Sequence, residues 1–420
     1  MTRVIVVGAG IVGLSTAYEL RSRGNDVLVI DREGREAAET SAATAGLIAP
    51  GHSYAWASPS APWELVRSLF SSDTSIRVRP RLDLELVAWG FRFLRECSAA
   101  RATSNTLAKL ELAQRSQTLF EKALRNNGFA FEPSSGGVLY LYRDPAALAR
   151  AVERGTLMRD HGRAQRQLGP TELFELEPAL SRSLPTFAGA IHDPSDSSGD
   201  PEQFAAELRA RAEAMGVEFR FGEPVTGFEV DGGRGVRAVR TERSVFPGDA
   251  FVVAGGPSSR ELLKRAGLRL PVYPARGYSV TAPITNDDDI PHRGGIDEKT
   301  LVAWSRFGNK LRLSATAEFA GYSTAHAPKD FDNILSAGNE LFPGALDFGR
   351  ATFRVGLRPM TPDGPPLIGP TKVPQLFLNT GHGHLGWTMA FGSAELLADY
   401  VSGNKPSIEP APYSPARWGI

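Results

Sequence analysis

The sequence is nearly free of cysteine, since Cys97 is the single one among 420 residues. One thiol excludes an internal disulfide and a cysteine-rich metal site, and it suits a reducing compartment. The apolar run at the N-terminus is too short for a signal peptide, and no stretch reaches the roughly 18 continuous apolar residues that cross a bilayer. We therefore expect a cytoplasmic protein without a transmembrane helix and without a bound metal ion.

The chain also lacks an excess of charge of either sign, because 47 Lys and Arg residues balance 47 Asp and Glu residues. Without a global positive field, a nucleic-acid partner is not expected. Internal repeats and low-complexity linkers are missing as well. A chain of 420 residues is too long for one compact core, so two domains are expected.

The N-terminal region contains a dinucleotide-binding pattern. Residues 4–7 form a β-branched run typical of a buried parallel strand, and Gly8, Gly10 and Gly13 follow in G-x-G-x-x-G spacing before an apolar helical stripe. A second strand ends at Asp31, where a carboxylate suits a ribose 2′-hydroxyl and repels a 2′-phosphate. NADP is therefore disfavoured, whereas this unit alone does not separate NAD from FAD.

Two later patterns favour FAD. Three short predicted strands between residues 225 and 253 precede Gly255, and such a meander is more typical of flavin-binding proteins than of NAD dehydrogenases. Residues 376–378 then form a predicted strand, and a glycine-rich loop over 380–386 leads into a helix predicted from Thr388. A second helix N-terminus of this kind can stabilise the anionic edge of a reduced flavin.

Motifs spread from end to end carry a family resemblance. Beside the N-terminal unit they are ETSAATAG (39–46), PVYPARGYS (271–279), GLRPMTPDG (356–364) and NTGHGHLGWTMA (379–390). With them the chain resembles the FAD-dependent D-amino acid oxidase superfamily, and within it the bacterial D-amino acid dehydrogenase small subunits. The resemblance implies an α/β fold in two interleaved parts, namely a Rossmann-like FAD-binding domain (1–53, 199–264 and 355–420) and a substrate-binding domain of β-sheet plus helices (54–198 and 265–354).

The same resemblance implies which residues form the site. Those expected to bind FAD are Val7, Gly8, Gly10, Ile11, Val12, Gly13, Asp31, Arg32, Thr40, Ser41, Ala45, Gly46, Leu47, Val225, Gly255, Gly383, Leu385, Gly386, Trp387 and Thr388. Arg358 would hold the substrate carboxylate, because an arginine fork binds both of its oxygens. The hydroxyl of Tyr278 could supply a third substrate contact, although a tyrosine in a strand is often part of the core. Related amine oxidases carry a pocket tyrosine on the strand corresponding to 301–305, which here reads LVAWS.

Three histidines and two sulfur-containing residues have side chains that could take part in chemistry or only pack. His52, His382 and His384 fall near the expected flavin loops, so covalent flavin attachment or acid–base roles are conceivable. Their spacing suits no metal site, and hydrogen bonding within the loops is the favoured interpretation. Cys97 and Met389 are expected to pack as apolar groups.

The resemblance implies oxidation of a D-amino acid at Cα, with hydride passing to flavin N5 and the imino acid hydrolysing to a 2-oxo acid and ammonia. It favours a quinone, or another acceptor that is not oxygen, as the electron acceptor. Alternatives are a glycine or sarcosine type of amine oxidoreductase and one acting on D-proline or D-hydroxyproline. A flavin hydroxylase is a non-amine alternative, but no second nicotinamide-binding unit is found in the sequence.

Residues 63–94 are rich in Trp, Phe and Leu and also contain Arg67, Arg77, Arg79 and Arg81. Leu84, Val87, Phe91 and Leu94 fall on one face of a predicted helix. This composition is compatible with resting on a membrane surface and equally with an ordinary helical cover of the substrate domain. Peripheral association with the cytoplasmic face of the inner membrane is therefore a second expectation for location.

Overall fold

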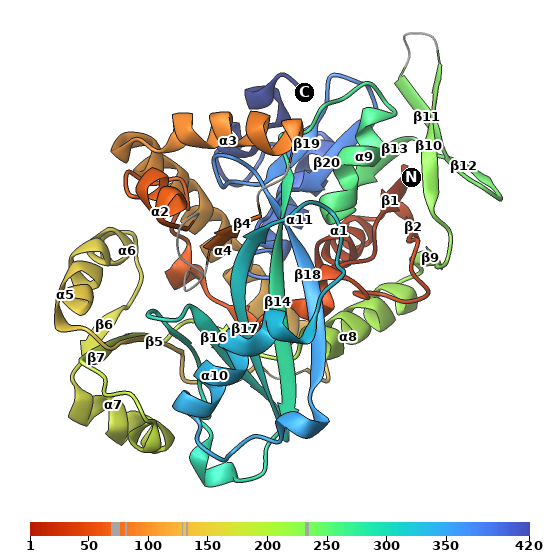
Figure 1. The fold of residues 1–420 in the computed structure, drawn as a ribbon. Coiled ribbons are helices and arrows are strands. Elements are labelled where there is room, and N and C mark those ends of the chain that lie inside the picture. Colours follow the sequence, from red (N-terminus) through yellow and green to blue (C-terminus); the bar gives the residue numbers. More distant parts are fainter. Residues whose placement is uncertain (69–75, 80–81, 128, 132, 232–234) are drawn as a thin grey trace.

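The computed structural model describes residues 1–68, 76–79, 82–127, 129–131, 133–231 and 235–420 (Figure 1). Six strands form the first sheet, in the order β19-β20-β13-β1-β2-β9. Their bounds are β1 Arg3–Val7, β2 Asp26–Ile30, β9 Glu218–Arg220, β13 Ala250–Val253, β19 Leu367–Pro370 and β20 Leu376–Thr380. Every pair in this sheet is parallel except β19 with β20. The Rossmann-like unit predicted from the glycine spacing is thereby confirmed.

Both faces of this sheet are buried, which explains its nearly continuous apolar strands. Val4 and Val6 of β1 belong to a core formed with α1 (Ile11–Ser22), α8 (Pro201–Ala214), α11 (Ala390–Ser402) and the long helix α4 (Ala99–Asn127). Ile5 and Val7 point to the opposite face, where they meet α9 (Ser259–Lys264) and the predicted meander. That meander is a separate antiparallel sheet made of β10 (Val225–Asp231), β11 (Gly235–Thr241) and β12 (Val245–Pro247).

A second, mixed sheet lies below the first in Figure 1 and forms the expected substrate part. Its order is β18-β14-β17-β16-β15-β5-β7-β6, with β4 pairing beside β17. The bounds are β4 Ile76–Val78, β5 Val138–Tyr142, β6 Arg166–Leu168, β7 Gly189–Asp193, β14 Tyr273–Pro283, β15 Gly294–Asp297, β16 Val302–Phe307, β17 Lys310–Phe319 and β18 Thr352–Met360. The expected domain boundary at residue 355 falls inside β18, which pairs with β14 of this sheet along its length.

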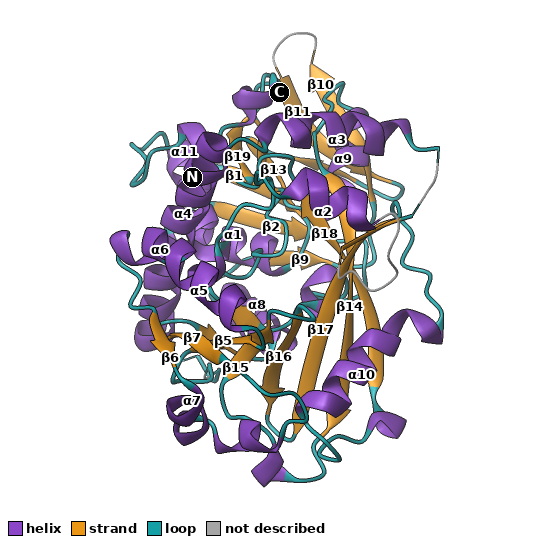
Figure 2. Ribbon diagram, turned by 60° about the vertical axis from the view of Figure 1, so that its left-hand side comes forward, coloured by secondary structure: helices purple, strands orange, loops and turns teal. Residues whose placement is uncertain are grey.

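Helices flank the second sheet on its outer sides (Figure 2). They are α5 (Pro145–Arg154), α6 (Thr156–Asp160), α7 (Pro170–Leu176) and α10 (Asp332–Leu341), while the short strands β3 (Leu47–Ile48) and β8 (Ser197–Ser198) pair with each other. The predicted helix start at 200–203 is present, since Asp200 caps α8 by accepting from the backbone N–H groups of Glu202 and Gln203. Helix α11 begins at Ala390, two residues after its predicted start at Thr388.

Two helices near the edge of the molecule, α2 (Ala61–Ser68) and α3 (Leu84–Glu96), carry the Trp- and Phe-rich segment. The predicted helical face of Leu84, Val87, Phe91 and Leu94 exists, and it points to solvent. Arg81 and the side chain of Arg67 lie outside the described residues. None of the helices in the described ranges is both long and apolar enough to cross a membrane.

The two sulfur-containing residues pack as predicted. Met389 is fully buried in the core between the first sheet and its helices. Cys97 is buried beside Trp89 and Phe93, its thiol donates to the carbonyl of Phe93, and burial raises its pKa. A thiol that stays protonated is a poor nucleophile, so Cys97 has a structural role.

Candidate active site

One continuous cavity of about 900 Å³ runs from the first sheet to the second. At the first sheet it is lined by residues that directly follow parallel strands, namely Gly8 after β1, Asp31 after β2, Ala254 to Pro257 after β13, and His382 after β20. The carboxyl ends of parallel strands meet at one edge, which is where open α/β sheets bind ligands. At the second sheet the lining comes from β4, β14, β15, β16, β17 and β18.

The first glycine loop is built to let a phosphate chain approach the backbone. Gly8 has φ +113, and a Cβ there would lie 2.7 Å from the carbonyl oxygen of Ala254. A Cβ on Gly13 would lie 1.9 Å from the carbonyl oxygen of Gly8, so α1 packs directly on the end of β1. Gly10, Ile11 and Val12 at the N-terminus of α1 line the cavity, and a helix N-terminus, whose first N–H groups have no partner within the helix, favours anions.

Asp31 closes the nucleotide end of the cavity. Its carboxylate accepts from the backbone N–H of Ala9 at 2.5 Å and from that of Glu33 at 2.8 Å. Burial raises the pKa of Asp31, although both hydrogen bonds and the nearby Arg32 oppose the shift. Each carboxylate oxygen has a further lone pair, so Asp31 can still accept from a ribose hydroxyl. The loop and Asp31 together fit the dinucleotide half of FAD.

The predicted cofactor residues divide into two groups. Those lining the cavity are Gly8, Gly10, Ile11, Val12, Asp31, Thr40, Ser41, Ala45, Leu47, Gly255, Gly383, Leu385, Gly386 and Trp387. The others, which do not line it, are Val7, Gly13, Arg32, Gly46, Val225 and Thr388. Several of these support the lining instead. Gly13 lets α1 pack closely on the end of β1. The hydroxyl of Thr388 accepts from the backbone N–H of Ala49 at 3.2 Å.

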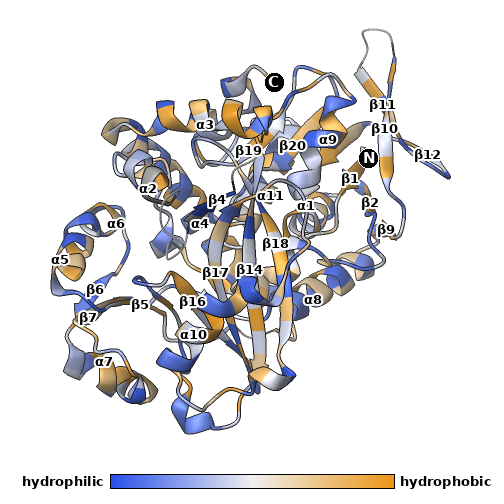
Figure 3. Cartoon of the chain, in the orientation of Figure 1, coloured by the Kyte–Doolittle hydropathy of each residue, from blue (hydrophilic) through white to orange (hydrophobic). Residues whose placement is uncertain are grey.

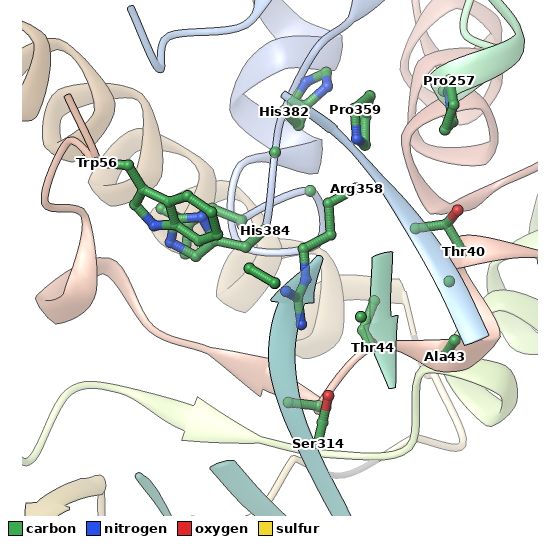
Figure 4. A pocket seen from close by; sticks show the side chains of 18 of the residues that line it. Thr40, Ala43, Thr44, Trp56, Pro257, Ser314, Arg358, Pro359, His382 and His384 are labelled. Carbon is green, nitrogen blue, oxygen red and sulfur yellow. The ribbon is translucent and has the colours of Figure 1, made fainter. Parts of the chain in front are cut away.

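Arg358 lies where a substrate carboxylate could reach it. It comes from β18 and covers Gly277 of β14, where a Cβ would lie 2.5 Å from the guanidinium. One NH1 donor is bonded to the carbonyl of Thr316 at 2.7 Å, and the described residues place no carboxylate within ion-pair distance. Burial lowers the pKa of Arg358 to about 10, so it stays charged at neutral pH. A charged, uncompensated fork facing a cavity is an anion site (Figure 4).

Tyr278 does not line the cavity, so the structure does not support the direct substrate contact expected for it. Its side chain is fully buried in the core of the second sheet, where the ring meets Phe331 edge-on. The hydroxyl donates to Glu318 at 2.7 Å, and Glu318 also pairs with Arg276. Neighbouring Gly277 faces the cavity, so the alternation of β14 turns Tyr278 away from it.

Two imidazoles from the second glycine loop, those of His382 and His384, line the cavity. The sequence had favoured only hydrogen bonding within the loop for them. The Nε2 atoms of His382 and His384 are buried and have no hydrogen-bond partner among the residues that the structure describes. Burial lowers the pKa of His382 to about 3, and burial together with the nearby charges of Lys109, His52 and Arg358 holds that of His384 far below its usual value. Both rings are therefore neutral at pH 7. The ring of Trp56 stacks on His384 at 5.1 Å (Figure 4).

The far end of the substrate region contains a polar group that sequence reasoning largely missed. His52 Nε2 lies 3.2 Å from Oε1 of Glu298, and the His52 ring stacks on Tyr140. Burial opposes the ionisation of Glu298, but His52 and Arg154 outweigh it and lower its pKa. Arg154 also lies over the ring of Tyr54 at 4.3 Å. No motif marks Glu298, Arg154 or Tyr54, because they come from a turn, a helix end and a loop far apart in sequence.

A buried ionic network holds the loop that presents His52. Arg163 pairs with Asp193 at 2.7 Å and with Asp196 at 2.6 Å. Asp196 in turn accepts from Gly51 N–H at 3.1 Å and from the hydroxyl of Tyr140 at 2.6 Å. The network therefore fixes both the backbone beside His52 and the ring on which it stacks. In the described part of the chain, no three His, Cys, Asp or Glu side chains gather closely enough to hold a metal ion.

Comparison with known proteins agrees with this geometry. Residues 3–400 match the FAD dependent oxidoreductase family. The chain is 42% identical to D-amino acid dehydrogenase 2 of Mesorhizobium japonicum over 409 residues, covering 97% of this chain and 98% of that protein. It is 38% identical to D-amino acid dehydrogenase of Neisseria meningitidis over 416 residues, covering 99% of each.

Solved structures share the fold at lower sequence identity. Glycine oxidase from Geobacillus kaustophilus superposes with a TM-score of 0.75 at 22% identity, covering 99% of this chain and 98% of that one. L-proline dehydrogenase from P. horikoshii superposes with a TM-score of 0.75 at 18% identity, covering 99% of this chain and 97% of that one. The predicted fold, with its Rossmann-like part and mixed-sheet part, is confirmed. The chain belongs to the FAD dependent oxidoreductase family.

Proposed function

We propose that this protein is an FAD-dependent D-amino acid dehydrogenase. The observation that carries the proposal is the uncompensated guanidinium of Arg358, which faces the same cavity as the dinucleotide loop. An amino acid held there by its carboxylate would have its Cα in the part of the cavity between Arg358 and the second glycine loop. The full-length relatives named as D-amino acid dehydrogenases support the same class of substrate.

Positioning is the main task of the protein groups in this reaction. FAD, when bound, accepts the hydride from Cα. Arg358 binds the substrate carboxylate through both oxygens and so fixes one end of a small molecule. The neutral imidazole of His384 lies beside Arg358 and adds no second positive charge to this part of the cavity. Trp56 lines the same part of the cavity and stacks on the ring of His384.

The reaction balances as a two-electron oxidation. The amino acid loses the Cα hydrogen as hydride and one proton from its neutral amine, which leaves a C=N bond. Water then adds to this imino acid, giving a 2-oxo acid and ammonia when the amine is primary. The two electrons pass to an acceptor, for which we propose a quinone.

The first expected result is stereochemical. Mixed without oxygen, D-alanine or D-proline should bleach the flavin absorbance band of the purified protein, whereas the L-enantiomers should leave it unchanged. Bleaching by L-amino acids alone would contradict the proposal. Bleaching by NADH but by no amino acid would point to a flavin hydroxylase, and stoichiometric hydrogen peroxide in air would point to an oxidase of the glycine or sarcosine type.

We also propose that the protein acts at the cytoplasmic surface of a membrane. Trp63 of α2 and Leu84, Val87, Phe91 and Leu94 of α3 are between 47% and 86% exposed. Arg92 and Arg95 lie exposed on the same helix. Along α3 the ribbon of Figure 3 carries both hydrophobic and hydrophilic residues. Apolar side chains beside arginines are typical of helices that lie on anionic lipid.

A vesicle-binding measurement tests this location. The holoenzyme should co-sediment with vesicles of phosphatidylcholine and phosphatidylglycerol, and Phe91→Asp should weaken binding at least tenfold, because burying a phenylalanine is worth about 1.5–3 kcal/mol. Val245→Asp is the matched control, since Val245 is 49% exposed on β12, away from α3. Equal binding of both variants and the parent would show that α3 is not the lipid contact.

A further inference from the structure

The cavity is also lined by residues of α2, α3 and β17, which come from outside the nucleotide loop and form an arm of it. We define this apolar arm by six of its lining residues, Ala61, Leu65, Leu86, Trp89, Phe93 and Phe319. The rings of Trp89 and Phe93 stack at 5.2 Å, and the indole N–H of Trp89 is already bonded to the carbonyl of Met360 at 3.0 Å. These six side chains offer apolar contact, and Glu64 of α2, which also lines the cavity, is the charged residue beside them.

The inner end of the apolar arm opens beside the substrate anchor. Phe319 lies on β17, three residues beyond Thr316, whose carbonyl holds Arg358. Three residues along a strand span about 10 Å. Met360, which binds the Trp89 indole, is two residues from Arg358 on β18. The arm is thus a second branch of the same cavity and not a separate pocket.

The outer end of the arm reaches the exposed apolar surface of α3. Leu86, Trp89, Gly90, Phe93 and Leu94 line the cavity at helical spacing, while Leu84, Val87 and Phe91 lie on the neighbouring face and are exposed. Leu94 belongs to both sets, since it lines the cavity and is 47% exposed. A ligand can therefore pass from the surface of α3 into the arm along a path lined mainly by apolar side chains.

We propose that the apolar arm binds a lipid-soluble quinone, which enters from the surface of α3 and collects the electrons of the reaction. The proposal rests on the proposed function, because that reaction leaves two electrons to be removed. The amino acid gives up two electrons and two protons on becoming the imino acid, and the two carbonyl oxygens of the quinone take up the same number to form a quinol. An amino acid is the less suitable occupant, because the charged residue that lines the cavity here, Glu64, would repel its carboxylate.

Gly90 provides a direct way to block the arm. It lines the cavity, and a Cβ added there meets no atom within 4 Å, so a larger side chain can be accommodated without displacing backbone. Phe in place of Gly90 should fill the arm between Leu86 and Leu94, its neighbours one turn away on each side. Ala88→Phe adds the same ring to an exposed position of α3 that does not line the cavity and is the matched control.

The experiment compares acceptors in the holoenzyme, with D-alanine as the donor. Gly90→Phe should raise KM for decylubiquinone about tenfold or more, with Gly90→Leu intermediate, while flavin bleaching by D-alanine and turnover with ferricyanide stay at the parent level. Ala88→Phe should match the parent with both acceptors. Normal bleaching shows that each variant is folded and loaded with flavin.

Three outcomes would overturn the proposal. They are a parent-like KM for decylubiquinone in both Gly90 variants, a parent that reduces ferricyanide but no quinone, and a raised KM for D-alanine or D-phenylalanine with an unchanged KM for decylubiquinone. The last would assign the arm to the substrate side chain. A parent whose flavin no D-amino acid bleaches would instead refute the proposed function, so the two failures are distinguishable.

Discussion

Replacing Arg358 by leucine should lower kcat/KM for the best D-amino acid about 10²- to 10³-fold while the flavin content stays near that of the parent. The guanidinium is held in place by the Thr316 carbonyl and has no carboxylate of its own. Without it, the substrate carboxylate is left partly desolvated and unpaired, at a cost of roughly 3–5 kcal/mol. Each 1.36 kcal/mol or so corresponds to a factor of ten in rate.

Two comparisons separate a carboxylate anchor from a structural role. Arg358→Lys should recover little activity, since an ammonium keeps the charge but cannot bind both oxygens in one plane. An amine without a carboxylate should be a poor substrate for the parent and lose little more in the leucine variant. Parent-like kcat/KM in Arg358→Leu, or loss of folded protein, would remove Arg358 from the substrate site.

Gly13→Ala should yield protein with less than about a tenth of the parent flavin, because one added methyl group forces α1 away from β1. Its Cβ would lie 1.9 Å from the carbonyl oxygen of Gly8, which is backbone and cannot rotate aside. Overpacking of this kind costs about 1–3 kcal/mol or more. The resulting shift also moves the N–H groups that would hold the pyrophosphate. Flavin absorbance relative to protein absorbance measures the loss.

Gly34→Ala is the matched control, since Gly34 belongs to the same N-terminal unit and a Cβ there meets nothing within 4 Å. It should bind flavin as the parent does. Gly10→Ala is a graded intermediate, because its Cβ would lie 3.2 Å from the hydroxyl of Ser41, a side chain that can move. Full flavin content in Gly13→Ala would mean that the contact of α1 with β1 can relax without cost.

The nucleotide half of the site could be predicted because its determinants are local. The glycines and Asp31 lie within one strand–helix–strand unit, where short-range sterics decide the geometry. Arg358 could be placed from a motif. Glu298 and Arg154 could not, because their approach to the cavity depends on how distant strands and helices pack. The burial of Lys109 depends on packing in the same way. A lysine within an amphipathic helix is expected to lie in solvent. The amino group of Lys109 is instead buried and donates to the carbonyl oxygen of Tyr54 at 2.8 Å.

Tyr278 shows where strand patterns fail. The sequence places Gly277 and Tyr278 on one strand, and only the orientation of that strand decides which of them faces the cavity. The pairing of β14 with β17 shifts register between Arg276 and Tyr278. Because of this shift, the alternation of side chains counted along the sequence does not show which side of the strand faces the cavity. For helix α3 the predicted helical periodicity is correct, but periodicity alone does not show what each face contacts. One apolar face of α3 lines the cavity, and the other is exposed to solvent.

The strand order of the first sheet has a consequence for synthesis of the chain. Central β1 is translated first, yet its neighbour β13 follows only at residues 250–253, and β20 covers the far edge of β13 only at 376–380. Loop closure over such distances is slow, and the edge of β13, with the sequence AFVV, stays unpaired until β20 has been translated. Until then this parallel edge is open to pairing with another chain, which makes the partly synthesised first sheet prone to aggregation.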